Sequence, residues 1–237
     1  MPARVDPRLV AVVTLAVACG CASARYALNP EEHERLSRGK GPMSIVMYDP
    51  AQPDPTSVLR QRAVPVSPED PDLTALVERM NTTLTREGGV GLAAPQIGVS
   101  RRVVLVVHGT RPKGQPTRVE LYLNPRVDWA SPEQDDDYEA CLSIAGIGGL
   151  VPRAKRIKVS YDPLGGGPRR VIELTDWDAR VMQHEIDHLD GVLFLDKLKG
   201  KPLPMDEMRM LRDAGHRARG WLPPAAPATA PAAPRTE

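Results

Sequence analysis

Four short β-rich runs lie close together between two helical segments, and this order restricts the folds that the chain can adopt. The runs span residues 102–107, 119–123, 157–161 and 169–174. Turns rich in Gly and Pro separate several of them, as at residues 109–116. Helices do not alternate regularly with these strands, as they would in a parallel βαβ sheet. The sequence therefore predicts an α+β fold.

Three segments carry helical signals. The first helix is predicted over residues 70–88, with Asp70-Pro71 as N-cap and first helical residue. Its apolar residues recur at helical spacing, at Leu73, Leu76, Val77, Met80 and Leu84. A second helix is predicted over residues 176–190, ending at Gly191. A third, amphipathic helix is predicted over residues 206–216.

Composition separates a folded part from its extensions. With 31 basic and 30 acidic residues the formal net charge is +1, so nothing in it indicates a nucleic-acid partner. The last stretch is rich in Ala and Pro and has little bulky apolar surface to bury, so residues 221–237 are expected to form a disordered tail. A catalytic domain is expected over residues 45–220, after a polar tether over residues 25–44.

The motif His184-Glu185-Ile186-Asp187-His188 falls within the second predicted helix. Side chains four residues apart are neighbours on one helix face, with Cβ atoms about 6 Å apart. Two imidazoles so placed can bind one metal ion, and Glu185 can reach a water on that metal. The same pattern arises by chance on a charged helix face. The presence of a third ligand would favour a metal site over a chance pattern.

Two residues, Glu207 and Cys141, are candidates for this ligand, and a third position is excluded. Phe194 stands where the metzincin proteases, H-E-x-x-H-x-x-G-x-x-H, carry their last His, and Phe cannot bind a metal. Glu207 could act as the downstream Glu of thermolysin-like enzymes, but it lies in a polar segment. Cys141, in Glu139-Ala140-Cys141-Leu142-Ser143, offers a thiolate, which is a strong ligand for Fe(II) or Zn(II). Taken alone, Cys141 is better explained as an inert buried thiol.

Residues 88–98 form a small, apolar segment whose one polar side chain is Gln96. Glycines allow a backbone to approach a ligand closely. A Gln amide can donate a hydrogen bond to a developing oxyanion. Taken alone, the segment is better explained as a tight loop between a helix and a strand.

Together and in this order, the three segments resemble the motifs of the peptide deformylases. These are G-x-G-L-A-A-P-Q at residues 89–96, E-G-C-L-S at residues 139–143, and H-E-x-x-H within residues 183–191. The likeness extends over residues 57–198, which is most of the folded part. Three separate motifs in one order are a specific signal. We therefore expect antiparallel strands packed around a central helix that carries H-E-x-x-H.

The resemblance implies roles for seven residues. The metal ligands fall on Cys141, His184 and His188, and the catalytic carboxylate falls on Glu185. The oxyanion donors fall on the Gln96 side chain and the Leu142 backbone N–H, and Gly91 lies beside the substrate. One divalent metal ion is implied, Fe(2+) by the resemblance or Zn(2+).

The implied reaction is hydrolysis of the N-formyl group of N-formylmethionyl peptides, releasing formate, by a monomer. An apolar pocket for the methionine side chain follows, and Val90 and Val181 are candidates for its lining. Ala140, Ala145 and the pair Asp176-Trp177 depart from the family's usual residues, and these departures concern the pocket more than the ligands. Two alternatives are a zinc endopeptidase and an envelope lipoprotein that keeps the fold with altered activity.

Residues 1–24 have the pattern of an export signal. A short segment with two Arg precedes an uncharged, largely apolar run over residues 9–18, which is too short to span a bilayer, and the A-x-A site Ala22-Ser23-Ala24 follows. Cys19 and Cys21 also resemble the lipid-bearing cysteine of bacterial lipoproteins, which would attach the enzyme to a membrane. The pattern predicts a location on the periplasmic side of the cell envelope. The alternative is a cytoplasmic enzyme that starts at Met43 or Met47.

Overall fold

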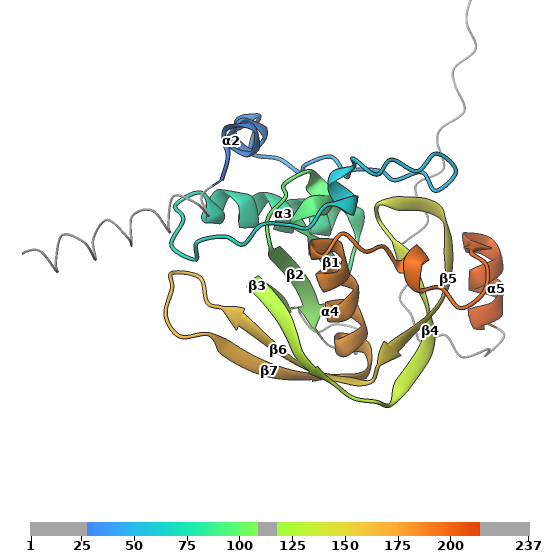
Figure 1. The fold of residues 1–237 in the computed structure, drawn as a ribbon. Coiled ribbons are helices and arrows are strands. Elements are labelled where there is room, and N and C mark those ends of the chain that lie inside the picture. Colours follow the sequence, from blue (N-terminus) through green and yellow to red (C-terminus); the bar gives the residue numbers. More distant parts are fainter. Residues whose placement is uncertain (1–27, 109–117, 214–237) are drawn as a thin grey trace, which may run out of the picture.

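A computed structural model describes residues 28–108 and 118–213 and shows two antiparallel sheets around one helix (Figure 1). The larger sheet has the order β1-β2-β3-β6-β7. Its strands are β1 (Gly91–Ala93), β2 (Val103–His108), β3 (Arg118–Ala130), β6 (Arg156–Asp162) and β7 (Arg170–Thr175). The smaller sheet consists of β4 (Gln134–Cys141), β5 (Ile144–Ala154) and β8 (Leu203–Pro204). Neighbouring strands pair antiparallel in both sheets, which confirms the predicted α+β class.

The central helix is α4 (Asp176–Leu189), one residue shorter than predicted. It packs against strands of both sheets, including β1, β2, β5 and β7 (Figure 1). Its buried apolar residues join a core cluster with residues of β2 and β6, among them Val104, Val106, Ile157 and Val159. The other helices are α2 (Pro30–Ser37), α3 (Leu73–Glu87) and α5 (Met205–Asp213). Among the described residues the 3-10 helices are η1 (Val58–Arg60), η2 (Ala94–Ile97) and η3 (Phe194–Lys197).

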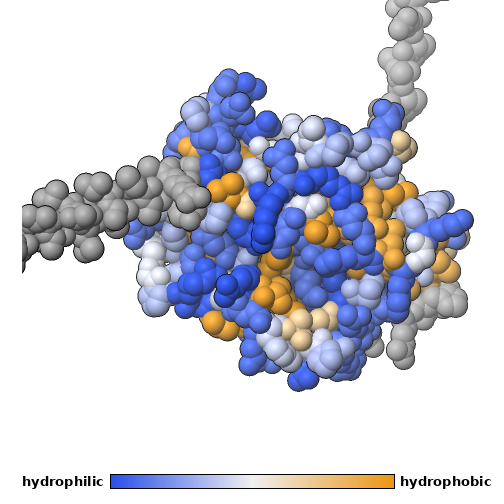
Figure 2. Space-filling model, in the orientation of Figure 1, coloured by the Kyte–Doolittle hydropathy of each residue, from blue (hydrophilic) through white to orange (hydrophobic). Residues whose placement is uncertain are grey.

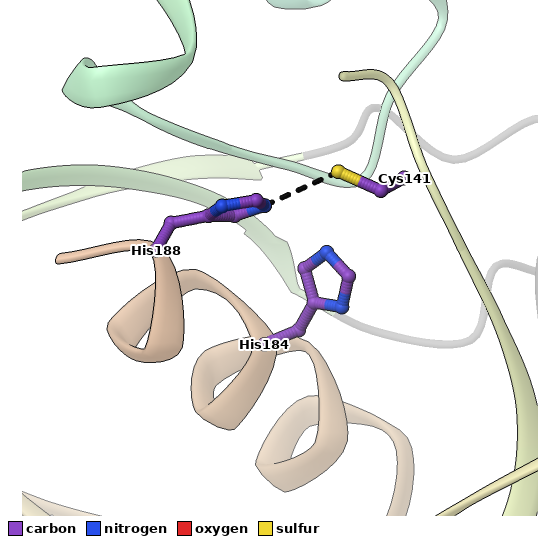
Figure 3. Close-up of side chains that lie close together, drawn as sticks. All are labelled: Cys141, His184 and His188. Carbon is purple, nitrogen blue, oxygen red and sulfur yellow. Dashed lines mark hydrogen bonds between the residues drawn. The ribbon is translucent and has the colours of Figure 1, made fainter. Parts of the chain in front are cut away.

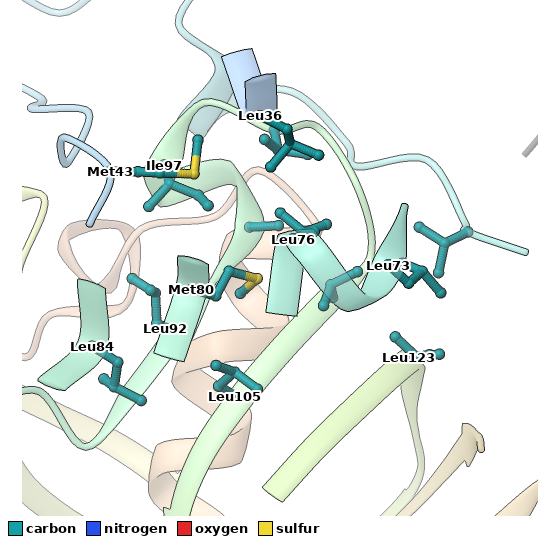
Figure 4. Packing of buried hydrophobic residues seen from close by; sticks show 14 of the residues in the cluster. Leu36, Met43, Leu73, Leu76, Met80, Leu84, Leu92, Ile97, Leu105 and Leu123 are labelled. Atoms are coloured by element: carbon teal, nitrogen blue, oxygen red, sulfur yellow. The ribbon is translucent and has the colours of Figure 1, made fainter. Parts of the chain in front are cut away.

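Helix α3 begins two residues later than the sequence suggested, at Leu73 and not at Pro71. The Asp70 carboxylate accepts a hydrogen bond from the Asp72 N–H at 2.9 Å, and the Asp70 carbonyl accepts one from Leu73 at 3.2 Å. Asp70 thus caps a turn that precedes the helix, and Pro71 lies in that turn. The apolar face of α3 packs on β1 and β2, with Leu76, Met80 and Leu84 near Leu92 and Leu105 (Figure 4).

The β4–β5 hairpin was not among the predicted strands. In β4 the buried positions are Asp137, Glu139 and Cys141, so the strand alternates with its polar residues facing inward. Hydrophobic alternation, the usual sign of a half-buried strand, is therefore missing. The predicted runs 119–123 and 169–174 correspond to β3 and β7, but β3 continues to Ala130 past an irregularity in its register.

The expected tether over residues 25–44 needs correction where the structure describes it. From residue 28 onward this segment is packed on the domain and includes the capped helix α2. Asn29 and Glu32 form a capping box, which stabilises the first turn of α2. Leu36 and Met43 are buried in the core cluster of α3. Because most residues of α2 are polar, the periodicity of the sequence did not identify Leu36 and Met43 as core residues.

Several predicted features lie outside the described residues. They are the leader over 1–24 with Cys19 and Cys21, the turn at 109–116, the third helix beyond residue 213, and the tail over 221–237. Among the described residues no helix is both long and apolar enough to cross a membrane. One face of the molecule is mostly hydrophilic, with its larger hydrophobic area on the side where β5 and α5 lie (Figure 2).

Candidate metal centre

Helix α4 places His184 and His188 one turn apart, facing the end of β4 where Cys141 lies (Figure 3). The candidate ligand atoms of the three residues all lie within 4.8 Å of one another. Cys141 Sγ is 3.2 Å from His188 Nε2. The structure therefore brings the three predicted ligands together around one point, although 43 residues separate Cys141 from His184 in the chain.

The surroundings of Cys141 favour its thiolate form. Its side chain is buried, and the Ser143 N–H donates to its sulfur at 3.4 Å. Burial raises the pKa of the thiol, but His188 and His184 lower it by more, to about 5. Because a thiolate and not a thiol binds a metal, this environment favours ligation.

Glu139 orients His184. No role was predicted for Glu139 from the sequence. Its carboxylate lies 2.9 Å from His184 Nδ1, which leaves Nε2 free to face the metal position. Arg153 binds the carboxylate through two hydrogen bonds of 2.8 Å, and Arg180 adds one of 2.8 Å. Burial raises the pKa of Glu139, yet Arg153 and His184 lower it far below its usual value. Glu139 therefore stays ionised in the interior.

Arg153 also pairs with Asp187, which lies between the two histidines in sequence. The position of Glu139 beside Cys141 was a signal that could have identified its role. Nothing in the sequence linked Arg153 or Arg180 to it, because the contacts cross from β5 and α4 to β4.

Glu185 lies next to the cluster in a buried environment. It is buried, and its Oε2 has no hydrogen-bond partner among the described residues. Burial raises the pKa of Glu185 to about 7, against the opposing effect of the two histidines. Gly91 of β1 lies against this carboxylate so closely that a Cβ there would overlap it. A carboxylate that titrates near neutral pH is suited to accept and return a proton.

Gln96 is held with its amide nitrogen toward the centre. Its Oε1 accepts a hydrogen bond of 2.8 Å from the Ala93 N–H, and this bond sets the orientation of the side-chain amide. Its Nε2 then lies 3.6 Å from Cys141 Sγ and 3.5 Å from Ser143 Oγ. Leu142 follows Cys141 in the turn between β4 and β5. Both predicted oxyanion donors thus lie beside the three-ligand cluster.

A cavity of about 60 Å³ opens at this centre. Both predicted pocket residues, Val90 and Val181, line it together with Gly91 and Leu142. Tyr138 and Trp177 also contribute to its wall, and neither was predicted to do so. The alternative ligand Glu207 is exposed on α5, and the ring of Phe194, which stands at the metzincin His position, stacks near His184 at 6.4 Å between ring centres.

The donor set fits a single transition-metal ion. One thiolate and two imidazoles are ligands that Zn(II) and Fe(II) accept, and three protein ligands leave a position for water or substrate. The hydrogen bond that Glu139 accepts from His184 Nδ1 is the second contact typical of metal-binding histidines. An α+β fold with this centre and a buried H-E-x-x-H carboxylate defines a metal-dependent hydrolase.

Comparison with known proteins narrows the class to a family. The sequence pattern of the polypeptide deformylases matches residues 48–202. A peptide deformylase of Desulfitobacterium hafniense is 47% identical over 145 residues, which cover 61% of this chain and 90% of that protein. The chain belongs to the polypeptide deformylase family.

Solved structures agree with this assignment. The crystal structure of the peptide deformylase from Thermotoga maritima is similar with a TM-score of 0.57 and 38% identity, over 67% of this chain and 99% of that one. A class I type b peptide deformylase from Acinetobacter baumannii, with Met-Ala-Ser bound, has a TM-score of 0.59 and 30% identity. That match covers 68% of this chain and all (100%) of the other.

Proposed function

We propose that the protein removes the formyl group from N-formylmethionyl peptides, releasing formate and a peptide with a free amino terminus. The observation that carries the proposal is the arrangement of Glu185 and Gln96 beside the Cys141–His184–His188 cluster, around one small cavity. The bound Met-Ala-Ser of the Acinetobacter baumannii relative is the peptide that such a reaction leaves. Membership of the family supports the same reaction.

Cys141, His184 and His188 would hold one divalent metal. When bound, the metal supplies Lewis acidity that makes water a stronger acid and hence a better nucleophile at neutral pH. We propose Zn(II), because an Fe(II) centre with a thiolate ligand would be more exposed to oxidation in an exported protein.

Glu185 is the proton carrier in this proposal. Its carboxylate accepts a proton from the attacking water as the new C–O bond forms at the formyl carbon. It then delivers that proton to the amine nitrogen as the C–N bond breaks, so that formate and the free amine leave. The pKa of about 7 allows both halves of this transfer near neutral pH. Burial keeps bulk water from exchanging with the carboxylate.

Gln96 and Leu142 stabilise the oxyanion that develops on the formyl oxygen. The Ala93 N–H holds Gln96 Oε1, so the amide Nε2 is already turned toward the centre and needs no reorganisation. The Leu142 backbone N–H is the second donor. One such donor typically contributes roughly 3 kcal/mol to transition-state stabilisation.

The cavity accounts for the substrate side chain. Val90 and Val181 supply apolar walls, as an unbranched methionine side chain requires. Gly91 lets the peptide approach Glu185 closely, since a side chain at this position would occupy the space beside the carboxylate.

We also propose that the enzyme acts outside the cytoplasm as a monomer, attached through Cys19 or Cys21 or released after residue 24. The pattern of residues 1–24 supports export. A start at Met47 would remove Leu36 and Met43 from the core, and a start at Met43 would remove Leu36, so the packing favours initiation upstream. Identification of the mature N-terminus by mass spectrometry in the native host tests this. A soluble form that starts at Met43 or Met47 would exclude export.

The function is tested by giving metal-loaded protein formyl-Met-Ala-Ser and, separately, unblocked Met-Ala-Ser. We expect one formate for each Met-Ala-Ser formed from the first peptide and no change in the second. Cleavage of internal peptide bonds without formate would indicate an endopeptidase. An inert metal-loaded protein would support a fold that has lost the activity.

A further inference from the structure

The segment of residues 28–46 precedes the part of the chain that matches the family, which begins at residue 48, yet it is built into the domain. Leu36 and Met43 belong to the same core cluster as Ile97, the last residue of η2, and as the buried residues of α3 (Figure 4). Helix η2 carries Gln96. The core cluster therefore joins this segment directly to the turn that holds an oxyanion donor. We call residues 28–46 the N-terminal brace.

A buried ion pair fixes the brace to the chain just after that turn. Glu32 Oε2 lies 2.7 Å from Arg101 Nη2 and 2.8 Å from Arg101 Nε, and both side chains are 6% exposed. Arg101 Nη1 has no partner among the described residues. Because a buried pair with an unsatisfied donor contributes little net stability, its main effect is to fix geometry.

Three side chains of α3 hold the other end of the brace. Arg79 donates hydrogen bonds of 2.7 to 3.1 Å to the carbonyls of Arg35 and Leu36, in the last turn of helix α2, and of Gly41 beyond it. Thr83 Oγ1 accepts from the Met43 N–H at 2.8 Å. Arg86 donates to the Met43 carbonyl at 2.9 Å, so α2 has little freedom to move on the domain.

The brace contacts the Gln96 turn from two sides. The Val46 N–H donates to the Gln96 carbonyl at 2.7 Å. On the other side the Arg35 guanidinium lies flat on Gly98, where a Cβ would be only 2.8 Å from Arg35 Nη1. Gly98 has φ of +78°, so glycine is favoured here by conformation as well as by space.

We infer that the N-terminal brace positions the Gln96 amide for catalysis, with Glu32 as a positioning residue that acts through Arg101. The catalytic part of this inference rests on the proposed function. The mechanical part does not, because the Ala93 N–H donates to Gln96 Oε1 and its hydrogen exchange reports directly on the amide.

The test compares full-length Glu32→Gln with Glu31→Gln, its exposed neighbour on α2. In metal-loaded Glu32→Gln we expect the Ala93 amide hydrogen to exchange roughly tenfold faster than in the wild type. This factor corresponds to the free energy of about one charge-assisted hydrogen bond, here one lost with the Glu32 carboxylate. We expect kcat to fall roughly tenfold with KM changed less than about twofold, since small displacements of a donor act on the transition state. Metal content should stay at one ion per chain, and Glu31→Gln should match the wild type.

Equal exchange at Ala93, or equal kcat, in the two variants would overturn the inference and leave the ion pair with a purely structural role. Should Glu32→Gln fail to fold, Arg35→Ala decides by the same two readouts, because it removes an exposed side chain that touches the turn. If the wild type releases no formate, the proposed function fails. The exchange comparison still decides whether the brace holds Gln96.

Discussion

At the scale of single residues, the chemistry of Glu185 depends on the burial of its carboxylate without a hydrogen-bonding cation. Its neighbour Glu139 is equally buried but ionised, because Arg153 and His184 offset the cost of burying its charge. Glu185 has no such cation within hydrogen-bond reach in the described residues, and burial raises its pKa to about 7. Two carboxylates in one core are thus suited to different roles: we propose that one holds a candidate ligand in place and the other moves protons.

The raised pKa of Glu185 predicts a pH-dependent cost in the metal-free protein. The folded-state value of about 7 exceeds the usual value of 4.5, so folding favours the protonated form, and this contribution is lost as pH rises through 7. We expect Glu185→Gln to gain stability over the wild type as pH rises from 4.5 to 7, by up to roughly 3 kcal/mol at 1.36 kcal/mol per pKa unit. Urea denaturation of both metal-free proteins at several pH values measures this, and a difference that does not change with pH would contradict it.

Cys141 is expected to be required for metal binding. Cys141→Ala removes the only thiolate of the cluster and leaves two imidazoles, too few for a stable mononuclear site. We expect the purified variant to hold far less than one metal ion per chain by elemental analysis. Glu207→Ala is the control, because Glu207 is exposed on α5, and it should retain the metal. Metal loss in the Glu207 variant alone would move the site toward the protease arrangement.

At the scale of elements, the sequence predicted helices α3 and α4 better than the hairpin between them. Helix α4 agreed within one residue, because its apolar face and Gly191 mark it clearly. The strands β4 and β5 were missed because β4 turns Asp137 and Glu139 inward. Arg153, the cationic partner of Glu139, reaches it only once β5 is folded back on β4. The three candidate ligands were predicted from the likeness of the motifs, whereas the hydrogen-bond network around them is visible only in the structure.

Arg153 is predicted to be a large contributor to the stability of this hairpin. Arg153→Met would leave Glu139 with a buried charge that has lost its bidentate partner, and breaking such a pair costs about 3–5 kcal/mol. Arg126→Met is the matched control: its pair with Asp128 also measures 2.8 Å, but Arg126 is 73% exposed. Exposed pairs contribute about 0–1 kcal/mol. Chemical denaturation should separate the two variants, and equal losses would mean that the buried network has no special weight.

At the scale of the whole molecule, the folded unit extends further toward the N-terminus than its family match. Composition placed a tether there, since α2 is mostly charged and its apolar anchors Leu36 and Met43 stand seven residues apart. The anchors are recognisable only by what they touch, namely the apolar face of α3 and Ile97. The sequence was sufficient to predict an α+β domain whose candidate metal centre lies on α4. It was not sufficient to predict the N-terminal boundary of that domain.

Deleting residues 1–46 is therefore expected to destabilise the domain, whereas deleting residues 1–27 removes none of the described contacts. The longer deletion loses the burial of Leu36 and Met43, worth roughly 1.5–3 kcal/mol each, and leaves Arg101 buried without Glu32. Thermal unfolding of the two truncated proteins, both loaded with metal, compares them directly. Equal melting temperatures would show that the segment adds nothing to the fold.

The central claim is that Glu185 transfers protons in formyl hydrolysis at a metal held by three other residues. It is tested most directly by the rate of formate release from formyl-Met-Ala-Ser by metal-loaded Glu185→Gln beside the wild type. Because Gln keeps the shape and loses the base, we predict a full metal ion per chain and a rate lower by about 10²–10⁴-fold. A metal-loaded Gln variant that releases formate at close to the wild-type rate would contradict the account.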